Sequence, residues 1–307
     1  MRTRRVVLIG GTGFIGSAVA YRLTARGCEV LVPTRRRARA AHLLPLPTVE
    51  IVEADVHDPA TLERLFTDAD AVVNLVGVLH SRPGQPWGPD FARAHVELPR
   101  GIVEACRRTG VGQLVHLSAL GARADGPSEY QRSKAAGEDA VRAAEPTVSW
   151  TILRPSVVFG RGDHFVNLFA SLVRIFPILP LAGANARFQP IFVGDVAEVA
   201  CRALEAPEAA GRVFELGGPD VFSLREIVHF VSRRLGLRRL VIPLPEGLAM
   251  AQAALMELAP APLMSRDNVR SMRVDNVTDA RLPFDLVPTA LEAAAPGWLD
   301  APAARHG

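Results

Sequence analysis

Two side chains that could handle a proton together lie in the segment Tyr130-Gln131-Arg132-Ser133-Lys134. The chain has only two tyrosines, and Lys134 is its only lysine, since the other basic residues are arginines. A site that needs a compact ammonium would not accept an arginine, which differs in shape, hydration and pKa range. Residues i and i+4 share a helix face, and an ammonium beside a phenol would lower the pKa of Tyr130 from about 10 toward neutrality. The pattern predicts a general acid and base at Tyr130, with a surface helix pair as the alternative.

A hydroxyl group stands at the end of the strand that precedes this segment. Ser118 directly follows the apolar run Gln113–Leu117. Open α/β sheets place their chemistry at the carboxyl ends of the strands. We therefore expect the Ser118 hydroxyl to hydrogen-bond a substrate carbonyl oxygen, so that Ser118, Tyr130 and Lys134 form the catalytic set.

A glycine-rich loop separates the first strand from the first helix. Gly10-Gly11-Thr12-Gly13-Phe14-Ile15-Gly16 has the spacing G-x-x-G-x-x-G directly after Val6–Ile9. In this strand–loop–helix context the glycines allow a tight turn and the close approach of a pyrophosphate. Amide groups at the helix N-terminus then meet the pyrophosphate charge. The residues expected to bind a dinucleotide here are Gly10, Thr12, Gly13, Phe14, Ile15 and Gly16.

The end of the second strand indicates the type of cofactor. The sequence Val32-Pro33-Thr34-Arg35-Arg36-Arg37 has no carboxylate to bind a ribose 2′-hydroxyl, whereas arginine is suited to phosphate. This favours NADP(H) over NAD(H), with Thr34, Arg35 and Arg36 around the 2′-phosphate and a solvated arginine run as the alternative. After the third and fourth strands, the residues expected along the cofactor are Asp55, Val56, Asn74, Val76 and Gly77.

The first half of the chain alternates between apolar runs of strand length and helical patterns, which predicts a doubly wound parallel sheet. The expected strands are Arg5–Ile9, Glu29–Val32, Val49–Val52, Ala71–Val76, Gln113–Leu117 and Thr151–Leu153. The expected helices between them are Gly13–Ala25, Ala60–Phe66, Phe91–Arg108 and Tyr130–Ala144. The rhythm breaks after Gly160. We therefore predict a dinucleotide-binding domain over residues 1–160, with its sheet completed by residues 190–217, and a smaller, mostly helical lobe over 161–307.

Composition excludes several classes of protein. The net charge is +3, and the cluster Arg35–Arg39 is too small for a nucleic-acid surface. Three separated cysteines without Cys/His spacing argue against a metal site or a disulfide framework and favour a cytoplasmic location. No stretch reaches the roughly 18 apolar residues of a membrane span. The apolar stretch Glu246–Leu258 is expected to be a lobe helix or a face for a partner.

These motifs together resemble the short-chain dehydrogenase/reductase superfamily, whose catalytic set is Ser, Tyr-x-x-x-Lys and a Gly-rich loop. The similarity covers most of the chain and is greatest to the extended and atypical branch related to the nucleotide-binding accessory subunit of respiratory complex I. It is carried by Asn74-Leu75-Val76-Gly77, Ser118-Ala119-Leu120-Gly121-Ala122, Arg154-Pro155-Ser156-Val157-Val158-Phe159-Gly160, Gln189-Pro190-Ile191 and Leu216-Gly217-Gly218-Pro219.

The resemblance implies roles for individual residues. Tyr130 would exchange a proton with the substrate oxygen, Lys134 would also hold the nicotinamide ribose, and hydride would pass to or from the nicotinamide. Pro155 and Val158 would lie against the cofactor, and the substrate would meet Arg154, Phe159 and Gln189. Many extended members have Asn in the fourth helix, where this chain has His95-Val96-Glu97.

Three functions are compatible with these features. The first is an NADP(H)-binding oxidoreductase for the carbonyl or hydroxyl of a small lipophilic or quinone-like substrate, because the segment Phe165–Ala186 has few charges that could hold a second pyrophosphate. The second is a catalytically silent NADPH-binding accessory or assembly protein of a respiratory or quinone-synthesising complex. It would dock through residues 246–258 at the inner membrane. The third is a sugar-nucleotide epimerase or dehydratase.

Overall fold

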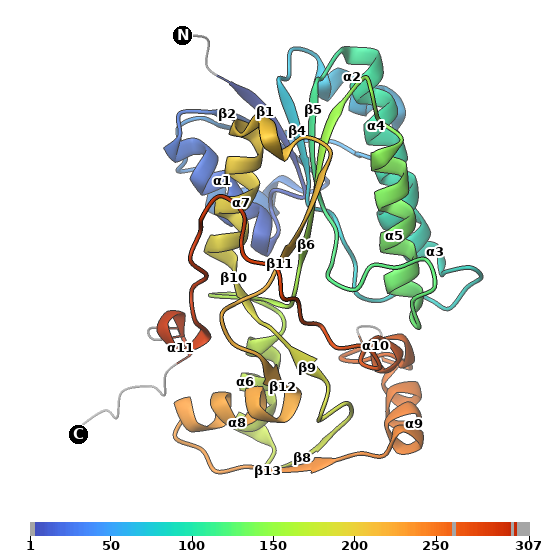
Figure 1. The fold of residues 1–307 in the computed structure, drawn as a ribbon, viewed down its shortest axis with the longest axis vertical. Coiled ribbons are helices and arrows are strands. Elements are labelled where there is room, and N and C mark those ends of the chain that lie inside the picture. The colour runs from blue at the N-terminus through green and yellow to red at the C-terminus, as the bar shows by residue number, and fades with distance from the viewer. Residues whose placement is uncertain (1–3, 260–261, 296–297, 300–307) are drawn as a thin grey trace.

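The computed structural model describes residues 4–259, 262–295 and 298–299 and has a parallel sheet at its centre (Figure 1). Its seven strands lie in the order β11-β6-β5-β4-β1-β2-β3. Their bounds are β1 Arg5–Ile9, β2 Glu29–Thr34, β3 Val49–Glu53, β4 Ala71–Asn74, β5 Gln113–Leu117, β6 Ser149–Pro155 and β11 Arg212–Leu216. The predicted doubly wound α/β fold is confirmed, and β1 and β5 have the predicted bounds.

Helices cover both faces of the sheet (Figure 1). On one face lie α1 Phe14–Ala25 and α7 Val193–Glu205, which pack against each other. On the other face lie α2 Pro59–Phe66, α4 Leu98–Thr109 and α5 Glu129–Arg142. The four apolar residues of β1, Val6–Ile9, are fully buried because each points into one of the two helical layers.

The helix predicted over Phe91–Arg108 has a different geometry in its first part. It consists of α3 Pro89–Phe91, a π-helical turn Ala92–Glu97 and then α4. A β-carbon at Gly137 of α5 would lie 2.1 Å from the carbonyl oxygen of His95, so only glycine lets α5 pack this closely on the π-helical turn. Such turns insert one residue into a helix and frequently occur at functional sites.

The remaining elements are shorter. The strands are β7 Val158–Phe159, β8 Ile178–Leu181, β9 Arg187–Phe188, β10 Ile191–Phe192, β12 Phe222–Ser223 and β13 Leu240–Pro243. The helices are α6 Val166–Ile175, α8 Leu224–Arg234, α9 Glu246–Met256, α10 Arg266–Ser271 and α11 Leu291–Ala294, with 3-10 helices at Arg37–Leu43 and Pro207–Ala209. We call α6, β8, α8, β13, α9 and α10 the lobe. The boundary at residue 160 stays a prediction.

The lobe has its own apolar core, distinct from the two cores that flank the sheet. Phe169, Val173, Leu179, Val228 and Val241 are buried there together. The helix predicted over Glu246–Leu258 is present as α9. Within the described ranges, no helix is both long enough and apolar enough to cross a membrane.

The chain between α10 and α11 returns from the lobe to the sheet (Figure 1). Asn276 in this segment donates from Nδ2 to the carbonyl oxygen of Leu120, just after β5, at 3.2 Å. Its Oδ1 accepts from the Ser156 hydroxyl, just after β6, at 2.6 Å. One side chain thus joins the carboxyl ends of two neighbouring strands.

Candidate functional site

The parallel sheet brings the predicted cofactor residues to a single edge. All seven strands run in the same direction, so their carboxyl ends lie side by side. The glycine loop follows β1, Thr34 ends β2, Asp55 follows β3, and Asn74 ends β4. The sheet order reverses between β1 and β4, which is where open α/β sheets bind dinucleotides.

The glycine loop fits a dinucleotide pyrophosphate. Gly10 has φ of +83°, and its carbonyl oxygen accepts from the Gly13 amide at 3.1 Å, which closes the turn. A β-carbon on Gly16 would lie 2.2 Å from that same carbonyl oxygen, so Gly16 lets α1 begin against the loop. α1 has no side-chain cap at Gly13 and no acidic residue in its first turn. Its first amides, including those of Phe14 and Ile15, are therefore available to an anion.

The end of β2 presents exposed cations. Arg35 and Arg36 are exposed, and their guanidinium groups make no hydrogen bond or ion pair with the part of the chain that the structure describes. The hydroxyl of the buried Thr34 is held within the turn, where it donates to the carbonyl oxygen of Arg36 at 3.2 Å. Arg37 instead donates to the carbonyl oxygen of Ile51 at 2.9 Å. Two arginines thus remain at this edge that could meet a phosphate.

Asp55 and Asn74 differ in how open they are. Asp55 is exposed and lies 3.7 Å from the Arg93 guanidinium, while Val56 packs against the core. Asn74 is buried, and its Nδ2 donates to Nδ1 of His116 at 3.1 Å while its Oδ1 accepts from the amide of Val76. The Asn74 side chain therefore shapes the turn toward the half-buried Val76 and the exposed Gly77 from within, and its own polar atoms have internal partners.

Tyr130 lies in the first turn of α5 among aromatic rings. Its ring centroid is 5.5 Å from that of His95 and 6.0 Å from that of Phe91, and both pairs meet edge to face. Burial raises the pKa of Tyr130 to about 12. The lowered pKa predicted from the i, i+4 spacing is wrong for this structure, because removal of the phenol from water by burial dominates its pKa. Tyr130 is therefore a neutral phenol, a proton donor, at physiological pH.

Lys134 is only 3% exposed, and its ammonium lies at the end of β5. Nζ donates to the carbonyl oxygen of Leu117 at 2.7 Å. Burial lowers the pKa of Lys134 to about 8, and the Glu138 carboxylate partly offsets this effect. The Lys134 ammonium is thus mostly charged at neutral pH, but it loses its proton at only slightly higher pH.

This pKa predicts how stability depends on pH. Between pH 8 and 10.5, unfolded Lys134 holds its proton more tightly than folded Lys134, so the wild-type chain gains stability as the pH rises. Relative to a Lys134→Met variant, the gain should be on the order of 3 kcal/mol. Urea unfolding of both proteins at pH 7 and pH 10 measures it. Comparison with the variant removes the opposing effect of the buried cysteines, whose raised pKa values lower the stability of both proteins at alkaline pH. A stability difference between the two proteins that does not change with pH would contradict the low pKa of Lys134.

The His95 side chain in the π-helical turn makes hydrogen bonds to Ser133 of α5 and to the backbone of Val78 after β4. The Ser133 hydroxyl donates to the carbonyl oxygen of Tyr130 at 2.9 Å, so it accepts from Nδ1 of His95, also at 2.9 Å. Nε2 of His95 accepts from the amide of Val78 at 3.0 Å. These bonds fix the Nδ1–H tautomer. Burial and the charge of Lys134 lower the pKa of His95 to about 2, so the ring stays neutral.

Ser118 has a partner that the sequence did not reveal. Its hydroxyl donates to Oε1 of Glu138 at 2.6 Å, and Glu138 is fully buried. Arg154 binds both oxygens of this carboxylate, at 2.8 and 2.7 Å, and Arg142 binds one of them at 2.7 Å. Burial opposes the charge of Glu138, but these bonds outweigh it and hold its pKa below the ordinary value. Because a hydroxyl has one proton to donate, Ser118 cannot also donate to a substrate in this arrangement.

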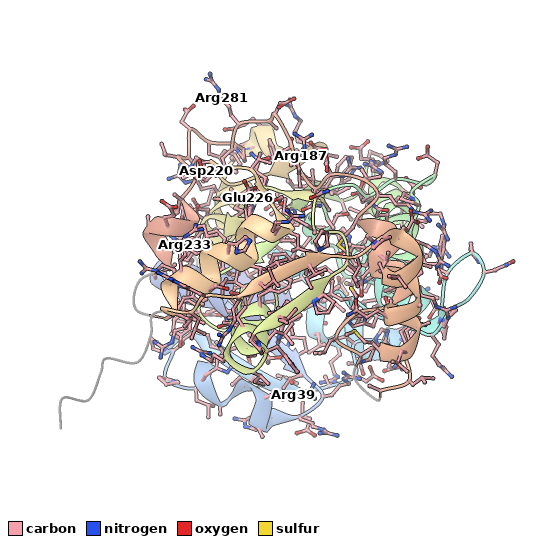
Figure 2. The ribbon with its side chains drawn as sticks, turned by 90° about the horizontal axis from the view of Figure 1, so that it is seen from below. Arg39, Arg187, Asp220, Glu226, Arg233 and Arg281 are labelled. Carbon is pink, nitrogen blue, oxygen red and sulfur yellow. The ribbon has the colours of Figure 1, made fainter. Side chains whose placement is uncertain are left out.

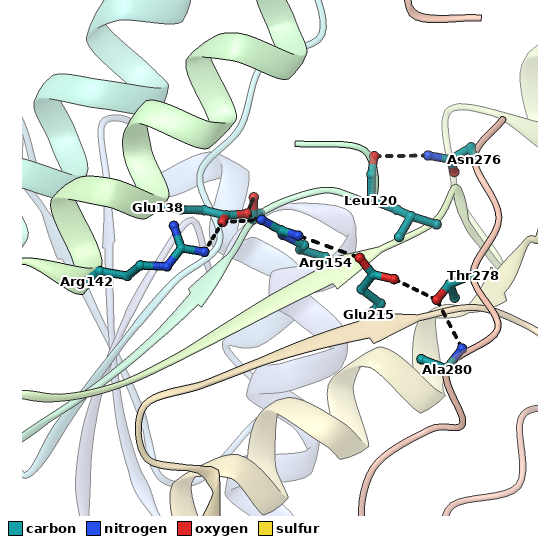
Figure 3. Close-up of polar contacts among 9 residues, drawn as sticks. Leu120, Glu138, Arg142, Arg154, Glu215, Asn276, Thr278 and Ala280 are labelled. Atoms are coloured by element: carbon teal, nitrogen blue, oxygen red, sulfur yellow. Dashed lines mark hydrogen bonds and ion pairs between the residues drawn. The ribbon is translucent and has the colours of Figure 1, made fainter. Parts of the chain in front are cut away.

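The network continues across the sheet edge to the C-terminal segment (Figure 3). Arg154 lies 3.6 Å from Glu215 of β11, which accepts from the Thr278 hydroxyl at 2.7 Å. Figure 3 shows these groups in a row from α5 to the chain near Ala280, with the Asn276–Leu120 bond beside them.

The three predicted substrate residues all have internal partners, and their contact with a substrate stays a prediction. Arg154 is held by Glu138, and Phe159 is fully buried against Phe192, with ring centroids 5.7 Å apart. Gln189 donates to the carbonyl oxygen of Gly218 and accepts from the amide of Thr278, both at 2.8 Å. The sequence could not show these contacts because each joins distant parts of the chain. Of the two cofactor residues that the resemblance implied here, Pro155 is buried at the end of β6 and Val158 is half-buried in β7.

The comparison with known families matches this architecture. The model of the NAD dependent epimerase/dehydratase family matches residues 6–217, which include the glycine loop, Tyr130 and Lys134. The chain belongs to this family. The predicted resemblance is thereby confirmed.

Proteins similar to this epimerase/dehydratase chain are named for different functions. It is 31% identical over 296 residues to NADH dehydrogenase [ubiquinone] 1 alpha subcomplex subunit 9, mitochondrial, from Mus musculus, covering 93% of this chain and 77% of that protein. It is 30% identical over 255 residues to a ceramide reductase from Caulobacter vibrioides, covering 82% and 77%. A nucleoside-diphosphate-sugar epimerase from Staphylococcus aureus has the same fold, with a TM-score of 0.75 at 16% identity over 94% and 98% of the two chains.

In this epimerase/dehydratase chain, hydrogen bonds also connect α5, which carries Tyr130 and Lys134, to the lobe. Both carboxylate oxygens of Asp267 in α10 accept backbone amides of α5, from Glu129 at 2.7 Å and from Tyr130 at 3.0 Å. A pocket of about 150 Å³ lies at this junction, and Phe91, Glu129, Asp267 and Arg270 are among the residues that line it. The sequence alone could not show that Asp267 would accept hydrogen bonds from the start of α5.

Proposed function

We propose that this chain is an NADP(H)-dependent reductase that converts a carbonyl group of a small lipophilic substrate to a hydroxyl. One observation carries the proposal: Tyr130 and Lys134 share one face of α5 at the cofactor edge of the sheet, with Tyr130 held as a neutral phenol. A reductase needs such a donor, because the oxygen of the carbonyl gains negative charge as hydride arrives at its carbon.

Each residue then has a separate task. When bound, the nicotinamide supplies the hydride. The Tyr130 hydroxyl donates its proton to the substrate oxygen, and Lys134 provides a positive charge that stabilises the tyrosinate left behind. The glycine loop and the first amides of α1 hold the pyrophosphate. His95 and Ser133 hold the backbone at Tyr130, and Ser118 belongs to the structural network around Glu138.

The segment Phe165–Ala186, from which the sequence analysis inferred a lipophilic substrate, does not support that substrate class in the structure. The segment, which has Arg174 as its single charge, contributes apolar side chains to the lobe core, where the rings of Phe165 and Phe169 meet at 5.5 Å, so it supports no particular substrate. Support for a lipophilic carbonyl compound comes from the ceramide reductase relative. The pocket at the α5–α10 junction adds Arg270, which could bind a polar head group on such a molecule.

The test is oxidation of NADPH by the purified chain. A panel of long-chain ketones, aldehydes and quinones should contain compounds that make the absorbance of NADPH fall, with the alcohol or quinol as product. Sugar nucleotides in the same assay address the epimerase alternative. If NADPH binds but no carbonyl compound or quinone oxidises it, the reductase proposal fails.

The preference for NADP(H) gives a sharper prediction. A double variant Arg35→Ser, Arg36→Ser should weaken NADPH binding about 100-fold or more, because each arginine contributes a charge-assisted hydrogen bond to the 2′-phosphate. NADH binding should change less than about twofold, since NADH lacks that phosphate. Isothermal titration with both cofactors measures the two constants. An equal loss for both cofactors would contradict the role of these arginines, and tighter NADH binding by the wild-type chain would contradict NADP(H) itself.

A second function is favoured by one observation, the 31% identity to mitochondrial complex I subunits across most of this chain. In that alternative, bound NADPH stabilises an accessory or assembly protein that performs no chemistry. A Tyr130→Phe variant separates the two functions in cells, because an accessory role would survive it. Loss of the cellular role with NADPH binding retained would favour the reductase.

A further inference from the structure

The end of the lobe farthest from the sheet has an unusual apolar surface. Figure 1 shows β8 and β13 together at the lower end of the molecule, and Figure 2 looks directly onto this end. The two strands are parallel, with Ile178 opposite Leu240 and Pro180 opposite Ile242. All four of these side chains point outward and are exposed. We call this pair of strands the lobe ribbon.

The lobe ribbon is apolar on both of its faces. Leu179, Leu181 and Val241 point inward and are buried in the lobe core. A sheet with one face in water normally alternates between apolar and polar residues. Here the outward positions are apolar as well, and Ile175 and Phe176 just before β8 are 70% and 49% exposed. The water-facing surface is therefore built for contact with something apolar.

α9 follows β13 after only Leu244 and Pro245 and adds exposed apolar side chains near the same lower end of the molecule (Figure 1). Its small residues Ala249 and Ala253 are buried against the lobe. Leu248 and Leu255, seven residues apart on one helix face, are 60% and 71% exposed, and Leu258 just beyond the helix is 80% exposed. Eight of the fourteen exposed large apolar side chains among the described residues lie in the ribbon, at the end of α6 and the turn after it, or in α9 and the residues just after it.

Cations lie at one end of the lobe ribbon. Arg174 precedes Ile175, and Arg238 and Arg239 precede Leu240. The segments that lead into β8 and β13 lie side by side, since Arg239 donates to the carbonyl oxygen of Val173 and the Leu240 amide donates to that of Pro177. Arg174 and Arg238 make no ion pair with any residue that the structure describes. There is no Asp or Glu between Asp163 and Asp195 or between Glu226 and Glu246.

The carboxylates at the two ends of α9, Glu246 in the helix and Glu257 just after it, both have partners. Glu246 pairs with Arg273, and Glu257 pairs with Arg266 at 2.9 Å. The apolar surface thus has unpaired cations at its edge and no unpaired anion among the groups just named. This charge distribution matches a negatively charged occupant.

We propose that the lobe ribbon and the outer face of α9 bind the surface of a bilayer rich in anionic lipid. Exposed Ile, Leu and Phe side chains would enter the boundary between head groups and acyl chains, and Arg174 and Arg238 would contact lipid phosphates. A bilayer fits better than a protein because the outward side chains of the ribbon have no polar groups to select a partner. This proposal does not depend on the proposed reductase activity.

Flotation of the full chain with vesicles, in the presence of NADPH, tests the proposal. The wild-type chain should float with vesicles of equal phosphatidylglycerol and phosphatidylcholine and stay in the buffer with phosphatidylcholine alone. The double variant Arg174→Gln, Arg238→Gln should bind the anionic vesicles about 25-fold more weakly, at about fivefold per charge. The variant Phe176→Ser, Ile178→Thr, Leu240→Thr, Ile242→Thr should not float at all.

A matched control carries Arg64→Gln and Arg100→Gln, two exposed arginines on α2 and α4 at the other end of the molecule, and should float like the wild type. Thermal unfolding checks that each variant is folded. The proposal is overturned if the wild-type chain stays off anionic vesicles at about 0.1 M salt, in which case a protein partner is the better explanation of this surface. It is also overturned if either the arginine double variant or the fourfold variant of apolar residues floats as well as the wild-type chain does.

Discussion

A Glu138→Gln variant is expected to unfold with a free energy about 3–5 kcal/mol lower than that of the wild-type chain. Glu138 is fully buried and accepts hydrogen bonds from Ser118, Arg142 and Arg154. Removing its charge leaves the partly buried Arg154 facing a neutral amide, and breaking one partner of a buried ion pair typically costs this amount. Urea denaturation followed by circular dichroism gives the difference.

The chain contains a matched control for this change. Glu104 also pairs with an arginine four residues later, Arg108, but both side chains are more than half exposed. Glu104→Gln should therefore cost less than about 1 kcal/mol. The pKa of Glu138 lies below the ordinary value of 4.5, so its contribution is present above that pH and is lost as the pH falls further. If Glu138→Gln is as stable as Glu104→Gln at pH 7, the network is not stabilising.

A Tyr130→Phe variant is expected to lose a factor of about 10²–10⁴ in kcat with the carbonyl substrate, because it removes the proton donor and nothing else. NADPH affinity and the free energy of unfolding should stay close to wild-type values, since the ring keeps its contacts with Phe91 and His95. Steady-state kinetics and NADPH titration measure the two effects separately. The pKa of about 12 keeps Tyr130 protonated over the usual pH range, while activity should fall above about pH 8 as Lys134 loses its charge.

The control for this variant is the other tyrosine of the chain. Tyr21 is on α1, is 48% exposed, and donates to the carbonyl oxygen of His42 at 3.1 Å. Tyr21→Phe removes the same atom at a distance from the site and should leave kcat unchanged. Turnover by Tyr130→Phe above a tenth of the wild-type rate would show that another group donates the proton.

The sequence predicted the sheet well because its signals are local. The run Val6–Ile9 is apolar since β1 is buried on both faces, and the glycines of the loop are required by the backbone itself. Pattern alone could not reveal the π-helical turn at Ala92–Glu97. It depends on the close approach of α5 at Gly137, a contact between segments about forty residues apart.

Single side chains were harder to predict than elements. The sequence did not single out Glu138 of α5, because its partner Arg154 lies in β6. The i, i+4 spacing placed Tyr130 and Lys134 on one face, but it could not show that the ammonium points to Leu117. Ser118 and Arg154 were expected to contact a substrate. The sequence does not show that the buried Glu138 carboxylate binds both side chains.

The bonds from Asp267 to α5 have a consequence for synthesis of the chain on the ribosome. The Glu129 amide and the carboxylate that accepts it are 138 residues apart. At about 5–20 residues per second, Asp267 is made roughly 7–28 s after α5. During that interval the glycine loop and β1–β5 already exist, yet the first two amides of α5 lack their acceptor. A nascent chain can therefore form the cofactor loop well before Tyr130 reaches its final position, and the complete site comes only with the lobe.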